Sequence, residues 1–491
     1  MYDVAVIGSG FGGSVAALRA SQAGKTVVVL EQGRRLTPED LQAGSQRATA
    51  LLWEPALGLH GYFRQALLRH LTVVGGIGVG GGSLVYAAVL LRPEHFDAPG
   101  WQAAGVDWAA ELDRHYDEAG RMLGRERNPQ RGLQDQWLQA AAERLGVGDT
   151  YGATYQGIRF ADCIACGQCI TGCPHGAKQS TDITYLAQAE ALGAVIQPLS
   201  KAEILVPYAG GWRVVVRNPL TGEVSSFEAR EVVLAAGVLG TVELLSACRD
   251  RWGTLPGLSP MLGRRVRTNS EAFSAILYPP GTDVSEGATI SSDFYPDART
   301  HVTNNRFPRS YGFMRWYLSP LVSGDRRRET VKAMLRHPGL ATANARARDW
   351  HKRVTVLTVM QHADNEMALE YRKSRTGWGL RSHIPAGVDP VPVSLPQADA
   401  AGQAMAEVSG GQAYSTVLES LLGMGATAHI LGGAVLGADP DAAVVDADHR
   451  VFGYDGLRVM DGSVVPENIG VNPSWTITAL AERACERWLK G

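Results

Sequence analysis

Charge imbalance and long apolar runs are both missing from this 491-residue chain, and each absence excludes a class of protein. Lys and Arg number 47 against 49 Asp and Glu, for a formal net charge of -2, so the basic excess typical of nucleic-acid-binding proteins is lacking. No apolar segment is long enough to cross a bilayer, and the chain begins without the basic and apolar regions of a signal peptide. We therefore expect a cytoplasmic protein without a nucleic-acid partner.

Cysteine is scarce, with six in the chain, yet four of them fall within the eleven residues from Cys163 to Cys173. Thiols stay reduced in the cytoplasm, so a tight group of cysteines favours metal binding or redox chemistry over disulfides. The length predicts two or three domains and a core that can enclose a large cofactor.

The first 33 residues have the order of elements of a dinucleotide-binding βαβ unit. The strand-like run DVAVIG is followed by GSGFGG, by a helical pattern, and by the strand KTVVVLE ending in Glu31. Gly8 permits the tight turn, Gly10 lets the backbone approach a pyrophosphate, and Gly13 allows the helix to pack on the strand. Glu31 stands where a carboxylate can accept hydrogen bonds from an adenosine ribose.

A second glycine-rich segment, at 75–93, predicts further backbone contact with a long ligand and so favours FAD over NAD. Glycine leaves the backbone N–H groups uncovered, and Ser83 adds a hydroxyl. A flexible surface loop is the alternative, but apolar runs flank this segment. The residues expected to contact the cofactor here are Gly78, Gly80, Gly81, Gly82 and Ser83.

The rest of the chain predicts an α/β protein with an α+β substrate domain. Three antiparallel strands at 202–230 and a separate buried strand at 232–237 lead back into the parallel sheet, and a strand, loop and helix follow at 457–489. We expect a Rossmann-type FAD-binding domain built from discontinuous segments, with an antiparallel sheet in the substrate domain. The expected segments are 1–268 with a cysteine-rich loop at 160–178, the substrate domain at 269–427, and a return to the FAD domain at 428–491.

Six motifs point to one family. They are GSGFGG near the N-terminus, GVGGGSLVYAAV at 78–89, VVLAAGVLGTVELL at 232–245, LGRRVRTNSE at 262–271, AHILGGAVLG at 428–437, and LRVMDGSVVPENIGVNPSWTITALAER at 457–483. Together they resemble the glucose–methanol–choline family of flavin oxidoreductases, and within it the cholesterol oxidase-like branch. The resemblance covers both terminal parts well and the middle loosely.

This resemblance implies FAD in an extended form and oxidation of an alcohol by hydride transfer to the flavin. It places the catalytic imidazole at His429. The pKa of an imidazole is ordinarily about 6.5, so this side chain can take the hydroxyl proton as the hydride leaves. It also places Asn472 at substrate and flavin, although Asn before Pro473 at a helix start is what helix capping alone would select. The implied cofactor contacts are Ala236, Asp461, Gly462, Asn472 and Pro473.

Two features of the family are not matched. Cholesterol oxidases use a glutamate as a candidate proton acceptor, and here the candidates are His362, Asp364 and Glu366, each of which is equally explained as a solvated strand-edge residue. Tyr86 stands where sterol oxidases have an asparagine. The resemblance therefore does not extend to sterol specificity.

The cysteine group has the spacing C-x2-C-x2-C-x3-C-P of bacterial ferredoxins, which predicts an iron–sulfur cluster, either 4Fe-4S or 3Fe-4S. The predicted ligands are Cys163, Cys166, Cys169 and Cys173. The fourth ligand is Cys173, a remote Cys248 or Cys485, or none. A tetrahedral zinc site and a metal-free thiol loop are the alternatives.

The cysteines decide which of several flavoenzymes we expect. FAD accepts two electrons while a cluster passes one at a time, so a cluster would favour a dehydrogenase with an external electron acceptor. The expected substrate is a bulky hydrophobic secondary alcohol, alicyclic or steroid-like. A cluster-free, oxygen-using oxidase and a flavoprotein isomerase or desaturase are the alternatives.

Segment 313–340 places Trp316, Tyr317 and Leu321 beside the basic run from Arg326 to Arg328. Such a mixture can form a lid that touches a membrane and collects a hydrophobic substrate. A solvated helix face is the alternative.

Overall fold

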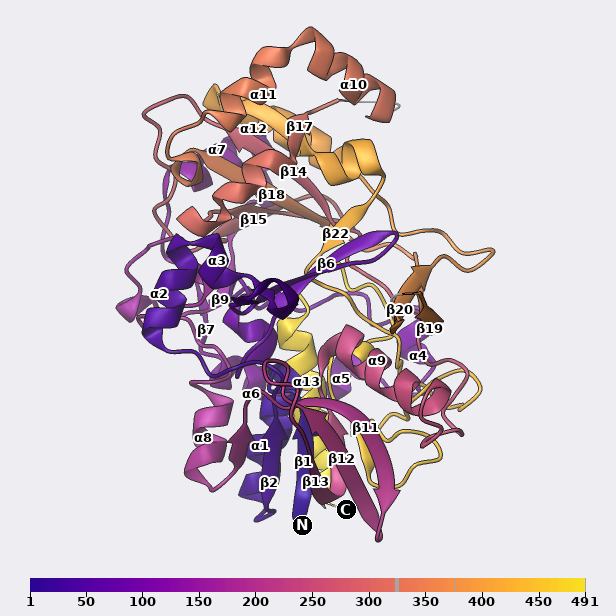
Figure 1. The fold of residues 1–491 in the computed structure, drawn as a ribbon. Helices are drawn as coiled ribbons and strands as arrows, with labels where there is room; N and C mark the ends of the chain where they lie inside the picture. The colour runs from indigo at the N-terminus through magenta and orange to yellow at the C-terminus, as the bar shows by residue number, and fades with distance from the viewer. Residues whose placement is uncertain (323–325, 376, 491) are drawn as a thin grey trace.

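The computed structural model describes residues 1–322, 326–375 and 377–490, which build one sheet at each end of the molecule (Figure 1). The lower sheet in that view carries both chain termini, the upper sheet is covered by helices, and strands β6 and β22 lie between the two. The predicted α/β class is confirmed, with strands and helices mixed in both halves.

The lower sheet, which we call the nucleotide sheet, has the order β10-β2-β1-β13-β12-β11, with β23 also paired to β13. Its strands are β1 (Tyr2–Ile7), β2 (Val27–Leu30), β10 (Val195–Gln197), β11 (Lys201–Tyr208), β12 (Gly211–Arg217), β13 (Val224–Leu234) and β23 (Leu457–Val459). The pairs β1–β2, β1–β13, β2–β10 and β13–β23 are parallel. Every residue of β2 is buried, as expected of a strand covered on both faces.

Strand β13 differs from the prediction of two separate strands in this part of the chain. Its first half pairs antiparallel with β12, from Val224 to Ala229, and its second half pairs parallel with β1, from Ala229 to Leu234. No turn residue interrupts the run, so one eleven-residue strand serves both purposes.

Helices α1 (Phe11–Gln22), α8 (Tyr185–Ala191), α9 (Gly237–Asp250) and α13 (Ser474–Lys490) surround the nucleotide sheet, together with α6 (Asp113–Met122). Helix α1 packs on both α13 and α8, and α6 packs on α13. The N-terminal and C-terminal parts of the chain therefore share one apolar core.

The upper sheet, which we call the substrate sheet, has the order β17-β21-β14-β18-β16-β15-β8. Its strands are β8 (Gly152–Ala153), β14 (Ala272–Leu277), β15 (Ser292–Asp297), β16 (Thr300–Asn305), β17 (Leu318–Pro320), β18 (Val354–Gln361) and β21 (Gln412–Thr416). All of its pairings are antiparallel. Helices α7 (Leu133–Arg144) and α12 (Pro396–Ser409) share its core.

Two hairpins flank the space between the sheets. Strands β19 (Ala368–Ser374) and β20 (Gly377–His383) pair with each other and form a sheet apart from the substrate sheet. Strands β5 (Phe63–Leu67) and β6 (Leu71–Gly76) form the second hairpin, and β22 (Gly425–Thr427) adds to β6 in parallel. The remaining longer helices are α2 (Pro38–Gln46), α10 (Arg326–Arg336) and α11 (Pro338–Ala345).

Glycines let the strand ends of the nucleotide sheet approach one another closely. A Cβ on Gly8, whose φ is +97°, would lie 2.2 Å from the Ala235 carbonyl oxygen after β13. A Cβ on Gly12 would lie 1.6 Å from the Met460 carbonyl oxygen after β23. The contacts of α1 with the end of β23 thus exclude any side chain at position 12.

We predict that Gly12→Ala destabilises the protein by ~3 kcal/mol or more, because the contact is with backbone that cannot rotate away. Urea unfolding monitored by tryptophan fluorescence measures the effect. Gly339→Ala is the matched control, since its Cβ would meet nothing within 4 Å, and it should change stability by less than about 0.5 kcal/mol. Equal stability of the two variants would contradict the packing argument.

Candidate active site

A cavity of about 860 Å³ opens at the carboxyl edge of the nucleotide sheet and continues beneath the substrate sheet. The carboxyl ends of parallel strands are where such sheets bind nucleotides, because helix N-termini and flexible turns gather there. The predicted site residues that line it are Gly8, Gly10, Glu31, Gly81, Gly82, Ala236, His429, Asp461, Gly462, Asn472 and Pro473. Three separated parts of the chain therefore meet at one cavity.

The other predicted cofactor residues lie one layer behind this wall. A Cβ on Gly13 would lie 2.0 Å from the Gly8 carbonyl oxygen, so Gly13 serves the packing of helix on strand. Gly80 donates its N–H to Ser9 Oγ at 3.0 Å, and Ser83 Oγ donates to the Gly80 carbonyl at 2.6 Å. Gly78 adopts a φ of +146°, which favours glycine. These residues shape the glycine-rich loop without lining the cavity.

Glu31 is held firmly at the end of β2. Its Oε2 accepts hydrogen bonds from Ser9 Oγ at 2.6 Å and from Ser9 N at 3.2 Å, and its Oε1 accepts one from Gly33 N at 2.9 Å. Burial raises the pKa of the Glu31 carboxyl, and the hydrogen bonds oppose that rise. The carboxyl is thus preorganised at the cavity wall.

These features fit a dinucleotide cofactor. At Gly82 an added Cβ would meet nothing within 4 Å, and at Gly10 only glycine backbone at 3.9 Å, so bare backbone faces open space. The N-terminus of α1 begins beside Gly10 and favours a phosphate there. FAD would be held by these backbone groups, with Glu31 at the adenosine end and Asn472 and Pro473 at the flavin end.

His429 and Asn472, the two residues expected to be catalytic, both line the cavity and lie side by side. Asn472 Nδ2 is 3.2 Å from His429 Nε2. The backbone N–H of His429 donates to Thr427 Oγ1 at 2.9 Å, which fixes the loop after β22. Asn472 Oδ1 is buried and has no hydrogen-bond partner among the described residues. An acceptor left open in this way can receive a hydroxyl group.

Glu271 completes the group and was not among the predicted residues. Its Oε1 contacts His429 Nδ1, and its Oε2 accepts a hydrogen bond from Ala428 N at 3.1 Å. The Glu271 side chain is 1% exposed and lines the cavity. The signal that could have found it is the motif LGRRVRTNSE, of which Glu271 is the last residue.

The three residues considered for the role of proton acceptor lie outside the cavity. His362 stacks on His95 with ring centroids 4.2 Å apart, and burial lowers its pKa to about 4. Asp364 has a 91% exposed side chain and pairs with Arg267 at 3.3 Å. Glu366 lies 3.7 Å from the same guanidinium. The carboxylate that contacts the histidine comes instead from the start of β14.

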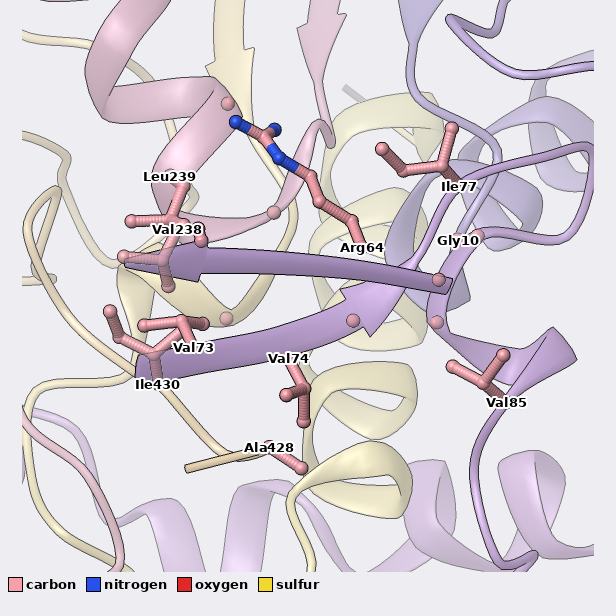
Figure 2. A pocket seen from close by; sticks show the side chains of 18 of the residues that line it. Gly10, Arg64, Val73, Val74, Ile77, Val85, Val238, Leu239, Ala428 and Ile430 are labelled. Atoms are coloured by element: carbon pink, nitrogen blue, oxygen red, sulfur yellow. The ribbon is translucent and has the colours of Figure 1, made fainter. Parts of the chain in front are cut away.

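The wall of the cavity beyond His429 is apolar and aromatic. Figure 2 shows Val73 beside Val238 and Ile430, with Val74 and Ala428 together on the other side of the β5–β6 hairpin. Arg64 reaches from β5 toward Leu239 at the start of α9 (Figure 2). Under the substrate sheet the aromatic lining residues are Phe63, Phe273, Phe307, Tyr311, Phe313 and Tyr317. This space suits a large apolar ligand.

The cysteine-rich loop forms part of the cavity wall through Ile170. Lys178, 2% exposed, ties it to the glycine-rich loop by donating to the carbonyls of Cys169 at 2.8 Å, Leu84 at 2.8 Å and Tyr86 at 3.3 Å. Burial lowers the pKa of Lys178 to about 8. Tyr86 lines the cavity and meets Phe11 edge to face at 5.2 Å.

The predicted cluster is not confirmed. Cys163, Cys169 and Cys173 pack around a small apolar cluster with Ala88 and Ala177, and all six cysteines are free thiols. In 1–322, 326–375 and 377–490, no group of three or more His, Cys, Asp or Glu side chains is placed to hold a metal ion. The remote Cys248 and Cys485 are buried in the core of the nucleotide domain.

The described parts of the segment predicted as a lid, 313–322 and 326–340, include residues of the cavity wall on the substrate side, and residues 323–325 lie outside the described residues. Trp316 is 68% exposed, and Tyr317 is partly exposed while it also lines the cavity. The run from Arg326 begins α10, on which Leu335 is 77% exposed. None of the helices in the described part of the chain combines the length and apolar character that crossing a bilayer takes.

Comparison of the sequence with known proteins identifies the family. Two models of the GMC oxidoreductase family match residues 6–248 and residues 343–481. The chain belongs to the GMC oxidoreductase family. Membership in this GMC family makes it a FAD-dependent oxidoreductase that acts on CH–OH groups, and a cofactor-binding fold of this kind is what the glycine-rich motifs predicted.

Curated relatives of this GMC protein include two cholesterol oxidases. One, from Mycobacterium tuberculosis, is 36% identical over 529 residues, covering 99% of this chain and 91% of that protein. The other, from Acinetobacter baumannii, is 35% identical over 521 residues, covering 98% and 93%. Among solved structures, pyridoxine 4-oxidase from "Mesorbium loti" has a TM-score of 0.66 at 18% identity, covering 100% of this chain and 99% of that one. That structural likeness shows the fold.

We predict that Glu271→Gln slows flavin reduction by an alcohol about 100-fold, because the neutral amide no longer stabilises positive charge as it develops on the His429 ring. Anaerobic stopped-flow absorbance of the flavin gives the rate. Glu366→Gln is the matched control, a carboxylate near Arg267 but outside the cavity, and it should keep the wild-type rate within about threefold. A wild-type rate in Glu271→Gln would remove Glu271 from the site.

Proposed function

We propose that this protein oxidises a bulky hydrophobic secondary alcohol, alicyclic or steroid-like, by hydride transfer to FAD. The observation that carries the proposal is the group of His429, Asn472 and Glu271 at the junction between the dinucleotide cradle and the aromatic part of the cavity. Bound FAD supplies the hydride acceptor, and the residues of this chain bind and orient the alcohol and take its proton.

His429 is the proposed base. The Glu271 carboxylate at Nδ1 favours a proton on that nitrogen, so Nε2 keeps its lone pair and faces Asn472 and the cavity. An alcohol that enters can donate its O–H to Nε2 while Asn472 Nδ2–H donates to the alcohol oxygen. When the hydroxyl proton moves to Nε2, the positive charge of the imidazolium is stabilised by the Glu271 carboxylate at Nδ1.

The shape of the cavity supports a large apolar substrate. Six aromatic side chains and the apolar residues Val74, Met314 and Leu318 surround the space beyond His429. Burying a rigid ring system there gains about 25 cal/mol per Å² of apolar surface, which is enough to orient a molecule with few polar groups. The two cholesterol oxidases among the relatives support a steroid-like substrate. Tyr86 stands where sterol oxidases have an asparagine, so oxidation of a sterol itself has to be tested.

The electron acceptor and the iron–sulfur cluster remain proposals. The spacing of the cysteines supports a cluster. The positions of the His, Cys, Asp and Glu side chains in the described residues give the cluster no further support. A protein without the cluster would pass its electrons to oxygen, as an oxidase does. The exposed apolar side chains near α10 support a peripheral contact with a membrane from which a hydrophobic alcohol is collected.

The substrate is tested by mixing the oxidised holoprotein, without oxygen, with cholesterol, a small alicyclic alcohol and a long-chain primary alcohol. We expect the visible absorbance of the oxidised flavin to bleach faster with cholesterol or with the small alicyclic alcohol than with the long-chain primary alcohol. His429→Ala should slow bleaching at least about 100-fold, and His362→Ala, outside the cavity, should not. Conversion of substrate to an isomer without bleaching would favour an isomerase instead.

Metal analysis of protein purified without air tests the cysteine loop. We expect no stoichiometric zinc, because no group of donors in the described residues is placed for a single ion. About three or four iron atoms per chain, with matching acid-labile sulfide, would confirm the cluster. Iron-free protein with a full complement of flavin would overturn it and make oxygen the acceptor to measure.

A further inference from the structure

One short segment, Arg267 to Glu271, contacts both of the loops that carry the catalytic side chains. Arg267 exchanges two backbone hydrogen bonds of 2.8 Å with Leu431, two residues after His429. Glu271 contacts the His429 ring and accepts the Ala428 N–H. The segment leads into β14 and so also joins the substrate sheet to the catalytic loops.

Asn269, in the middle of this segment, holds the other catalytic loop. Its side chain is completely buried, and Nδ2 donates to the Val471 carbonyl at 2.6 Å. Its own carbonyl accepts the Gln361 N–H at 2.8 Å, so the backbone at 269 is anchored to the end of β18. Asn269 Oδ1 has no hydrogen-bond partner in the described part of the chain. Of the two polar groups of the Asn269 side chain, the Nδ2–H donor is therefore the one that holds a neighbouring loop.

Ser270 sets the directions in which the side chains of its two neighbours, Asn269 and Glu271, point. Its φ is +49°, a left-handed conformation that is unfavourable for a residue other than glycine. Two buried amides hold it there, since Ser270 Oγ accepts hydrogen bonds from Asn365 at 2.6 Å and from Asn468 at 3.0 Å. The strained turn aims Asn269 at Val471 and Glu271 at His429.

We propose that Asn269 is a positioning residue for Asn472. Its hydrogen bond to the Val471 carbonyl orients the peptide that joins Val471 to Asn472, and this orientation sets the 3.2 Å approach of Asn472 Nδ2 to His429 Nε2. A small displacement of a reacting group costs a large factor in rate, so a residue that never touches substrate can control the chemical step. The inference rests on the proposed function and adds a residue to it.

Asn269→Leu tests the proposal, because leucine has a similar volume and no donor. We expect the anaerobic rate of flavin reduction at saturating alcohol to fall about 30-fold and the apparent KM to stay within about threefold. The alcohol is cholesterol or whichever member of the panel above reduces the flavin fastest. Asn269→Ala, measured in the same way, removes the donor without inserting a larger group and serves if the leucine variant does not fold.

A double-mutant cycle separates positioning from a structural role. In the Asn472→Ala background, Asn269→Leu should slow flavin reduction by no more than about twofold further, because the group that Asn269 positions is already gone. If Asn269 had only a structural role, the two substitutions would act independently, and the factors by which each slows flavin reduction would multiply. Rates are compared only between preparations with equal flavin content, read from the visible spectrum.

Asn128→Leu is the matched control. Asn128 is also a buried amide, 4% exposed, and its Nδ2 donates to Gln156 Oε1 at 2.9 Å, away from the cavity. It should lower the stability but leave the rate of flavin reduction unchanged. If Asn472→Ala is slow by itself and Asn269→Leu slows it further by the full factor that it has in the wild-type background, this inference alone is overturned. An unchanged rate in Asn472→Ala would overturn the role of Asn472 and this inference together.

Discussion

Close approach of backbone to backbone at the carboxyl edge of the nucleotide sheet is the constraint on which the rest of the structure depends. The Ala235 carbonyl lies where a side chain on Gly8 would be, and the Met460 carbonyl lies where one on Gly12 would be. This contact brings the ends of β1, β13 and β23 together, although they come from the start, middle and end of the chain. The cavity exists at that edge because nothing larger than hydrogen separates these turns.

The proposed catalytic group of His429, Asn472 and Glu271 is in contact with a second layer of buried polar residues. Glu271, which contacts His429, and Asn269, which donates to the Val471 carbonyl, lie on one segment of backbone. Asn365 and Asn468 hold that segment in turn through Ser270. Burying an amide or a carboxylate costs free energy unless its polar atoms form hydrogen bonds. Here most of these groups form hydrogen bonds that hold a neighbouring residue in its orientation.

The sequence predicts the parts of this arrangement that depend on local pattern. The βαβ unit, Glu31 at the end of β2 and the antiparallel character of the substrate sheet follow from motifs and their order, while the places of His429 and Asn472 in the cavity are what the family resemblance implies. Glu271 ends the LGRRVRTNSE motif, but local pattern does not predict its contact with His429, because the two residues are more than 150 positions apart and share no periodicity. The continuous β13 was divided in two for a similar reason, since pairing partners rather than propensity decide where a strand changes neighbours.

The pairing of β23 with β13 and of α13 with α1 has a consequence for synthesis of the protein. The last strand and helix complete a core whose first strand leaves the ribosome hundreds of residues earlier. Until β23 and α13 have been made, the emerging chain leaves exposed the surfaces of β13 and α1 that these two elements cover. A nascent chain of this kind needs protection from aggregation until these two elements have joined the core.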